Sequence, residues 1–241
     1  MRDKLKAIYA FLLDNRAYNK DLQEKYYTSI ISCRVDIKDK VSSLLYNVAN
    51  TQSQPKIDKL AQFYQFIYAD IESLTSFKKF VKRVSGKENG CYANLFQGLK
   101  KCSGWGEKTS ALFVKAIFHL HSGRYNDNLR LWDDAPQDIG ENDRIFLPVD
   151  AVIMEIFKKI GFVRCKFTAI NDEINKYYDG AAIEVWDDLW FWGFITQKGS
   201  GDQRAFGWNL NKYWSLEHSN KDVLVIKEIE EKSECFLKLL S

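Results

Sequence analysis

Apolar residues recur every three or four positions along most of the chain, which is the spacing of helices that bury one face. The stretch after Gly106 is a clear case, with Leu112, Phe113, Ala116 and Ile117 on one side. The same spacing predicts further helices at residues 4–13, 41–48, 57–74, 77–84, 150–160, 170–178, 181–195 and 222–240. Alternation of apolar and polar residues is scarce, so the sequence predicts an all-α fold.

The composition is that of a globular protein without long linkers. With 241 residues, of which 46% are hydrophobic, the chain can bury a sizeable core as one domain or as two closely packed subdomains. It has three prolines and no internal repeat, and residues 50–56 and 198–207 have the composition of loops. We therefore predict a single domain over residues 1–241. The net charge of +3 is too small to indicate a partner.

A pair of glycines joins two helical patterns within residues 99–120. Gly104 and Gly106 permit a tight turn and the close approach of another backbone, and Lys108 follows two positions later. The amides at the start of the second helix would have no intrahelical partner, so they suit a phosphate group. Two glycines before a helix are most often only a turn, so this pattern alone does not decide the function.

A second pattern lies at residues 146–150, where Phe-Leu-Pro-Val-Asp precedes a helix predicted to end at Gly161. Asp150 has the place and the residue type of the N-cap of that helix. Taken alone, an aspartate here indicates a structural cap rather than a catalytic carboxylate.

The segments Cys-Ser-Gly-Trp-Gly-Glu-Lys-Thr and Leu-Pro-Val-Asp together resemble the signature of the helix-hairpin-helix DNA glycosylases. That signature is a Leu-Pro-Gly-Val-Gly-x-Lys-Thr hairpin, followed by a Pro-Val-Asp that opens the next helix. Cys102, Ser103 and Trp105 replace the Leu, Pro and Val of the family hairpin. The residues that match the family are Gly104, Gly106, Lys108, Thr109, Pro148, Val149 and Asp150.

The resemblance covers residues 94–161 and implies two helical subdomains that flank a DNA-binding cleft. Residues 90–161 would form the hairpin and catalytic core, and the remaining N- and C-terminal helices would form the second subdomain and the base pocket. In one respect the chain departs from the family, because 42 positions separate Lys108 from Asp150, more than is usual there. Residues 124–144 are polar and rich in turn formers, which indicates an inserted surface loop.

The resemblance implies a bifunctional DNA glycosylase and abasic-site (AP) lyase of base excision repair, acting on damaged double-stranded DNA. Lys108 would attack C1′ of the sugar and form a Schiff base that leads to β-elimination, while Asp150 would stabilise positive charge on the sugar. An oxidised base, 8-oxoguanine first of all, is the expected lesion. The hairpin residues expected at the DNA are Lys101, Ser103, Gly104, Trp105, Gly106 and Thr109.

Three features around the hairpin leave alternatives open. Trp105 could touch the minor groove of the DNA or pin the hairpin to the core. In the family, the hairpin carbonyls also bind a monovalent cation. A group of cations near the hairpin forms either a basic DNA-facing surface or an ordinary solvated helix face. Its members are Lys78, Lys79, Lys82, Arg83, Lys87, Lys100, Lys101, Lys108 and Lys115.

The base pocket is expected in the segment Trp-Asp-Asp-Leu-Trp-Phe-Trp, where tryptophans and aspartates crowd one predicted helix. Asp188 and Trp192 are four apart and share a helix face. In archaeal 8-oxoguanine glycosylases an aspartate and a tryptophan in this relation contact the extruded base. The competing register uses Asp187 and Phe191. Leu112 replaces a phenylalanine that stacks on the base in that archaeal branch.

Cysteine and histidine spacing gives no support for a metal or an iron–sulfur cluster. The five cysteines form no Cys-x-x-Cys pair, and His119 and His121 are two apart, so they cannot face one metal from a helix. An odd number of widely spaced cysteines indicates reduced thiols inside a cell. The first apolar stretch is too short for a secretory signal, since Asp14 interrupts it, and no run is long enough to cross a membrane. We expect a monomer without a resident cofactor, in the cytoplasm or nucleoid, or in the nucleus of a eukaryote.

Two alternative functions remain. One is a helix-hairpin-helix protein that binds DNA without chemistry, in which Lys108 contacts a phosphate and Asp150 only caps a helix. The other is a glycosylase for another damaged base. The chain has no Gly-x-Ser-x-Gly and no Walker pattern, which argues against a serine hydrolase and a P-loop ATPase.

Overall fold

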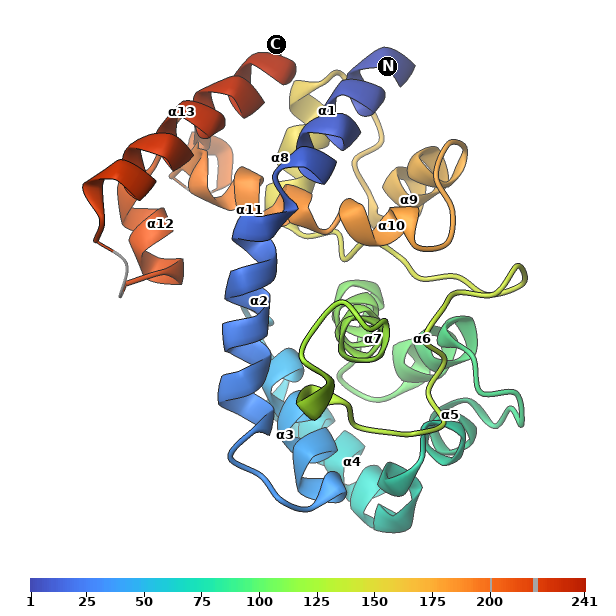
Figure 1. Cartoon of the computed structure of the whole chain (residues 1–241). Helices are drawn as coiled ribbons and strands as arrows, with labels where there is room; N and C mark the ends of the chain where they lie inside the picture. Colours follow the sequence, from blue (N-terminus) through green and yellow to red (C-terminus); the bar gives the residue numbers. More distant parts are fainter. Residues whose placement is uncertain (200, 219–220) are drawn as a thin grey trace. The chain divides into compact units, whose positions relative to one another are not determined.

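The computed structural model describes residues 1–199, 201–218 and 221–241, and it is mostly helical (Figure 1). The extended structure in these residues is a two-stranded antiparallel sheet of β1 (Gln197–Lys198) and β2 (Ala205–Phe206). The all-α class predicted from the spacing of apolar residues is therefore confirmed for the described part of the chain. None of the helices in that part has the length and hydrophobicity needed to cross a membrane.

The chain divides into two compact units, each built from segments that are far apart in the sequence. Asp150 belongs to the first of them, unit 1, and Lys108 belongs to the second, unit 2. The helices α2 (Arg16–Ile31) and α10 (Ala182–Val185) run across the boundaries between segments. The segments are Met1–Leu22, Val149–Tyr177 and Val185–Ser241 in unit 1, and Gln23–Pro148 and Tyr178–Glu184 in unit 2.

Unit 2 is a group of helices packed around one helix that is buried along almost its whole length. Its elements are α3 (Ile37–Ala49), α4 (Ile57–Tyr68), the 3₁₀ helix η1 (Ile71–Thr75), α5 (Phe77–Ser85), α6 (Tyr92–Lys101) and α7 (Glu107–His121). The buried helix is α7, which packs against α6 and α3, while α5 packs against α6. The aromatic side chains of Phe80 and Phe113 meet between α5 and α7. This packing fixes where the first turn of α7 begins, because the rest of the helix is enclosed.

Residues 124–144, which we call the strap, are irregular and largely exposed, as the sequence predicted for a surface loop, but some of their apolar residues are anchored in the core. Their backbone is irregular apart from the short η2 (Asp127–Leu129), but Leu131 is 6% exposed and Trp132 is 3% exposed. The indole N–H of Trp132 donates to the carbonyl of Leu74 at 2.7 Å. The sequence did not predict this anchoring, because single apolar residues such as Trp132 form no periodic pattern.

Two aspartates of the strap cap the N-termini of α5 and α6. Asp134 accepts hydrogen bonds from the Ser76 hydroxyl and from the first two amides of α5 at 2.7–3.0 Å. Asp143 accepts from the first two amides of α6 at 2.9 and 2.7 Å. Burial alone would raise the pKa of Asp134, but the hydrogen bonds at the start of α5 outweigh it and lower that pKa. The strap therefore stabilises α5 and α6 by satisfying their orphan amides.

Glu184 fastens the segment Tyr178–Glu184 to unit 2. Its buried carboxylate lies 3.2 Å from Nε2 of His119 and pairs with the guanidinium of Arg124. On its other side, His119 contacts the hydroxyl of Tyr27 through Nδ1 at 3.0 Å. A buried carboxylate needs such partners, since an unpaired charge in the core is costly.

Unit 1 brings the two ends of the chain together. Its helices are α1 (Arg2–Asp14), α8 (Ala151–Lys159), α9 (Phe167–Asn175), α11 (Asp188–Ile195), α12 (Leu210–Leu216) and α13 (Val223–Leu239). The first and the last of them lie side by side (Figure 1), and the Lys4 amine donates to the carbonyl of Ser241 at 2.6 Å. α8 packs closely on α11 at Gly193, where a Cβ would lie 2.4 Å from Cδ1 of Ile156. Only a residue without a side chain fits at this contact.

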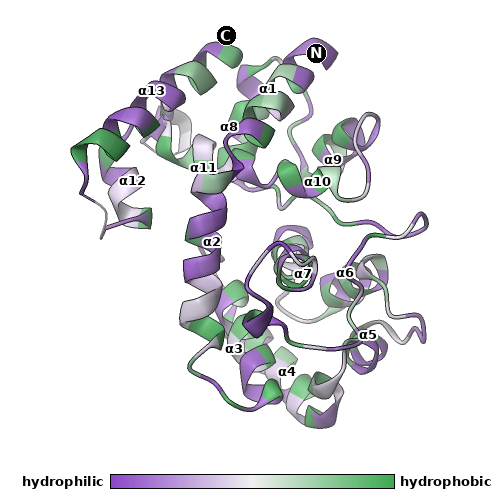
Figure 2. Ribbon diagram, in the orientation of Figure 1, coloured by the Kyte–Doolittle hydropathy of each residue, from purple (hydrophilic) through white to green (hydrophobic). Residues whose placement is uncertain are grey.

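The observed helices differ from the predicted ones where the chain is polar or changes direction. The sequence pattern does not predict α2, which is hydrophilic along most of its length and apolar only at its end (Figure 2). It does not predict the short α12 either. The helix predicted over residues 57–74 ends at Tyr68 and is followed by η1. The helix predicted over residues 181–195 is interrupted at Trp186 and Asp187, which separate α10 from α11.

Candidate active site

The glycine pair forms the turn between α6 and α7, as the sequence predicted. Gly104 has a φ of 79°, a left-handed conformation that favours glycine. A Cβ there would also lie 2.9 Å from Cδ2 and 3.1 Å from the backbone nitrogen of Leu60. The Gly104 carbonyl accepts a hydrogen bond from Nε2 of Gln52 at 3.1 Å. Conformation and space therefore both require a glycine at this position.

Gly106 differs from Gly104 both in its backbone conformation and in the space around it. It has an extended backbone, with φ −117° and ψ −179°, and a Cβ built on it would meet nothing within 4 Å. Gly106 is the N-cap of α7 and has no side chain to cap it, and in the part of the chain that the structure describes no side chain accepts a hydrogen bond from the amides of the first turn. The start of α7 therefore leaves amide donors free for an anion, which the positive end of the helix dipole favours.

Lys108 lies in this first turn and is half-buried. Its Nζ donates to the carbonyl of Thr51, just after α3, at 3.3 Å. Among the described residues no carboxylate pairs with Lys108, because the neighbouring Glu107 pairs with Lys100 at 2.9 Å. This matters for a nucleophile, since an ion pair would hold the amine in its charged, unreactive form.

Some of the predicted DNA-binding residues are inside the protein. Trp105 is 5% exposed and packs against Phe63 and Phe113, with ring centroids 5.0 and 5.9 Å away. It therefore pins the hairpin to the core, and its predicted contact with DNA is wrong. Thr109 is 3% exposed, so its side chain also faces the core rather than DNA. Thr109 points inward because it belongs to the buried side of α7, and Trp105, in the turn before α7, is enclosed by the rings of Phe63 and Phe113.

The other predicted hairpin residues are accessible. Lys101 and Gly106 are exposed, and Gly104 is partly exposed. The hydroxyl of Ser103 is also accessible, and it donates to Gln62 at 2.9 Å. These four positions stay predictions for contacts with a DNA backbone.

The predicted basic surface is smaller than the sequence suggested. Lys115 is buried, so it is not part of any surface. Lys82 pairs with Glu88, and Arg83 stacks on Phe66. Among the described residues, the lysines of this group that are exposed and pair with no carboxylate are Lys78, Lys79, Lys87 and Lys101.

Asp150 is the N-cap of α8, as predicted, and it has a second partner that the sequence did not reveal. Its Oδ1 accepts from the amide of Ile153 at 3.0 Å, and its Oδ2 accepts from the indole N–H of Trp190 at 3.0 Å. No cation pairs with Asp150 in the described part of the chain. Its negative charge is therefore oriented but not neutralised.

The predicted base-pocket residues lie in the core of unit 1. Asp188 is 2% exposed and accepts from Arg16 at 3.1 Å and from Asn19 at 2.6 Å. Trp192 is fully buried, and its ring meets those of Phe11 and Tyr18. Both side chains are enclosed in the structure as it stands, so their predicted contact with an extruded base would require unit 1 to open around them.

The competing register is buried as well. Asp187 is 5% exposed and Phe191 is 1% exposed. Leu112, on α7 in unit 2, is half-buried, and its role stays a prediction. All sides of α11 carry large apolar residues, so spacing alone could not say which side faces the core.

The accessible face of α11 carries Trp190 and Phe194, which sequence reasoning missed. Their rings stack with centroids 5.0 Å apart and planes 13° apart. Nζ of Lys212 lies 4.9 Å from the ring of Phe194, and burial, with Arg204 as a smaller cause, lowers the pKa of this lysine. Trp190 and Phe194 are four residues apart, like Asp188 and Trp192. The same spacing rule, applied two positions later, would therefore have identified the accessible pair.

The monovalent cation expected at the hairpin stays a prediction. The carbonyl of Gly104 accepts one hydrogen bond from Gln52, and the carbonyl of Cys102 accepts one from the amide of Trp105 at 3.1 Å. Within the described residues, His, Cys, Asp and Glu form no group that could hold a metal ion. Burial raises the pKa of the Cys102 thiol to about 11, so this neighbour of the hairpin stays protonated at neutral pH.

In comparisons with known proteins, no family model, curated protein or solved structure matches the chain. The function must therefore be inferred from the chain's own residues. The most informative of these are the two signature positions, Lys108 and Asp150, each at the start of a helix.

Proposed function

We propose that the chain is a bifunctional DNA glycosylase and AP lyase that acts on damaged double-stranded DNA, with 8-oxoguanine as its first expected substrate. The observation that carries the proposal is the position of Lys108. This lysine lies in the first turn of α7, directly after the glycine hairpin, and its amine pairs with no described carboxylate. Asp150 at the start of α8 supplies the second signature position.

Lys108 would act as the nucleophile. Its neutral amine attacks C1′ of the sugar while the bond from C1′ to the damaged base breaks, and the base leaves with the bonding electrons and takes up a proton. Opening of the sugar ring then yields a Schiff base between Nζ and C1′. Loss of a proton from C2′ drives β-elimination, which breaks the C3′–O bond and nicks the strand, and water finally releases the lysine. The damaged base must first leave the helical stack.

Asp150 would stabilise the charge that develops on the sugar. When the base departs, positive charge builds up on C1′ and the ring oxygen, and a fixed carboxylate lowers the energy of that state. Both oxygens of Asp150 accept hydrogen bonds from neutral N–H groups, and among the described residues no cation pairs with the carboxylate. The free amides at the start of α7 would meanwhile bind a backbone phosphate.

Borohydride trapping on a duplex with one abasic site tests the proposal. Wild-type protein should form a covalent adduct, because borohydride reduces the Schiff base to a stable amine. Lys108→Gln should form none, whereas the exposed Lys227→Gln on α13 is the matched control and should react like wild type. If wild type binds the duplex but forms no adduct, the chain is a non-catalytic DNA-binding protein and the proposed chemistry is wrong. An adduct that survives Lys108→Gln would show that another residue is the nucleophile.

The substrate is tested separately with duplexes that carry different damaged bases. Release of 8-oxoguanine faster than release of oxidised pyrimidines or alkylated purines would support the expected substrate. Faster release of another base would keep the enzyme class and change the lesion.

A further inference from the structure

The two oxygens of Asp150 are held by different parts of unit 1. The N-cap hydrogen bond from Ile153 comes from Asp150's own helix and fixes only Oδ1. The hydrogen bond to Oδ2 comes from Trp190, on α11, forty positions later in the chain. An N-cap alone therefore does not account for the orientation of this side chain, because the second oxygen is held from outside α8.

Trp190 is itself held firmly in place. Its ring stacks on Phe194, one helical turn further along α11. At Gly193 the backbone of α11 approaches α8 so closely that a Cβ would overlap Ile156. The contact between the two helices thus keeps the indole N–H aimed at Asp150.

The neighbouring tryptophans of the segment do not share this role. Trp186 and Trp192 are fully buried, and the Nε1 atom of Trp192 has no hydrogen-bond partner among the described residues. Trp190 is partly exposed, and its indole N–H donates to Asp150. The segment therefore contains two packing tryptophans and one that reaches a candidate catalytic group.

We propose that Trp190 is a positioning residue that holds the carboxylate of Asp150 in the orientation needed during base release. This inference rests on the proposed function, since Asp150 has a catalytic role only if the chain is a glycosylase. An indole N–H suits the task because it is a neutral donor with a fixed direction. A lysine or arginine at this position would neutralise the charge that Asp150 offers to the sugar.

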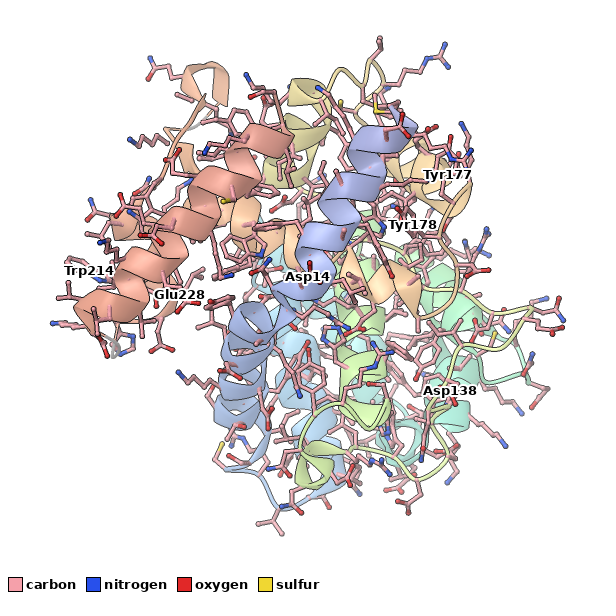
Figure 3. The ribbon with its side chains drawn as sticks, turned by 45° about the horizontal axis from the view of Figure 1, so that its top comes forward. Asp14, Asp138, Tyr177, Tyr178, Trp214 and Glu228 are labelled. Carbon is pink, nitrogen blue, oxygen red and sulfur yellow. The ribbon has the colours of Figure 1, made fainter. Side chains whose placement is uncertain are left out.

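Trp190→Phe tests the inference, because it keeps an aromatic ring and removes the N–H. We expect base release in single-turnover assays to slow by about tenfold, the size of effect expected when a charged group loses one hydrogen bond. The rate of cleavage at a preformed abasic site should change less than twofold, because the base is already absent there. Affinity for the duplex should also change less than twofold, because binding precedes base release. The control is Trp214→Phe on α12, which should leave all rates unchanged. Trp214 is labelled in Figure 3, and it is 39% exposed.

A double-mutant cycle separates positioning from a general structural role. Asp150→Asn keeps a good N-cap residue and removes the charge. If Trp190 acts through Asp150, adding Trp190→Phe to Asp150→Asn should slow base release no further. If the two effects instead add up fully, Trp190 acts independently of Asp150 and the inference is wrong.

A spectroscopic measurement tests the contact without using activity. The indole N–H resonance of Trp190 can be assigned in the wild-type protein by triple-resonance NMR, without a variant at Trp190, and it should shift in Asp150→Asn while the resonance of Trp214 stays in place. An unchanged Trp190 resonance would overturn the inference even if Trp190→Phe failed to fold. If wild type releases the base and Trp190→Phe releases it at the same rate, the inference is wrong but the proposed function stands. Absence of any base release or adduct with wild type would overturn the proposed function and the inference with it.

Discussion

The two helices that carry the signature residues begin in opposite ways. α7 begins at Gly106, which provides no side-chain cap and has open space where a Cβ would be. α8 begins at Asp150, whose carboxylate caps the helix and is held again by Trp190. The start of α7 therefore presents free N–H donors, whereas the start of α8 presents a negative charge.

This difference matches two different demands of the proposed reaction. A DNA backbone phosphate is an anion and suits the free amides and positive dipole at the start of α7. The sugar becomes cationic as the base leaves and suits the carboxylate at the start of α8. A helix N-terminus can therefore favour either an anion or a cation. The N-terminus of α7 has no capping side chain and favours an anion, whereas the carboxylate of Asp150 caps α8 and favours a cation.

The largest expected effect is on the free energy of unfolding, and it concerns His121 at the C-terminus of α7. Burial, together with the charge of Arg130, lowers the pKa of His121 to about 4, against the opposing effect of Asp134 and Asp133. The ring nitrogen Nε2 of His121 accepts from the amide of Leu131 in the strap at 3.4 Å. Protonation of this nitrogen would remove the acceptor, so the folded state resists it.

The unfolded chain takes up a proton at His121 near pH 6.5, whereas the folded protein does so near pH 4. The free energy of unfolding should therefore fall as the pH drops through this window, by about 2 kcal/mol at pH 5 and about 3 kcal/mol in total. Urea denaturation at pH 7 and pH 5 measures this loss. His121→Gln keeps a hydrogen-bond acceptor and should abolish that part of the pH dependence; an equally steep dependence in the variant would contradict the assignment.

A smaller loss of stability is expected at the hairpin from Gly104→Ala. Alanine at this position would have a left-handed backbone and its Cβ would press against Leu60, so the free energy of unfolding should fall by about 2 kcal/mol or more. Gly86→Ala is the matched control, because Gly86 has a φ of 70° but open space around its Cβ. Its cost should be only about 1 kcal/mol. Equal losses in the two variants would mean that the contact with Leu60 contributes nothing.

Gly106→Ser should affect binding instead of folding. The extended backbone accepts serine, and serine is a good N-cap, so the melting temperature should stay the same or rise slightly. Affinity for duplex DNA should fall by about tenfold, since the new side chain would cap the amides and occupy the space of a phosphate. Fluorescence anisotropy with a labelled duplex measures this, with Gly140→Ser as control. Unchanged affinity would remove the open start of α7 from the DNA-binding surface.

The smallest effect separates the two roles of Asp150. Asp150→Ala should lower the free energy of unfolding by about 1 kcal/mol relative to Asp150→Asn, because alanine cannot cap α8. The two variants should release the base at similarly low rates, since both lack the charge. Thermal denaturation and single-turnover assays measure the two quantities. A much faster Asp150→Asn enzyme would mean that capping, and not charge, is what the reaction needs.

Sequence patterns predicted the helices with a clear apolar face and both signature positions. Residues 77–84 and 150–160 were placed to within two residues of α5 and α8, and Asp150 is an N-cap as expected. Gly104 was correctly assigned to a turn. These features follow from local rules of spacing and capping, which involve only neighbouring residues.

Other features depend on tertiary contacts that local rules do not contain. α2 is too polar to show a periodic apolar face, and the strap is anchored in the core by single residues such as Trp132. Along α11 nearly every side chain is large and apolar, so the register that buries Trp192 and exposes Trp190 is set by packing against its neighbours. The hydrogen bond from Trp190 to Asp150 joins residues forty positions apart and has no local signal.

The pairing of α1 with α13 has a consequence for the order in which the chain folds. During synthesis most of unit 2, residues 23–148, leaves the ribosome before the later segments of unit 1 exist. α1 emerges early but must wait for α13, and such pairing between distant segments is slow because a long loop has to close first. Unit 1 is therefore completed last, and Asp150 gains its indole partner only after α11 has been made.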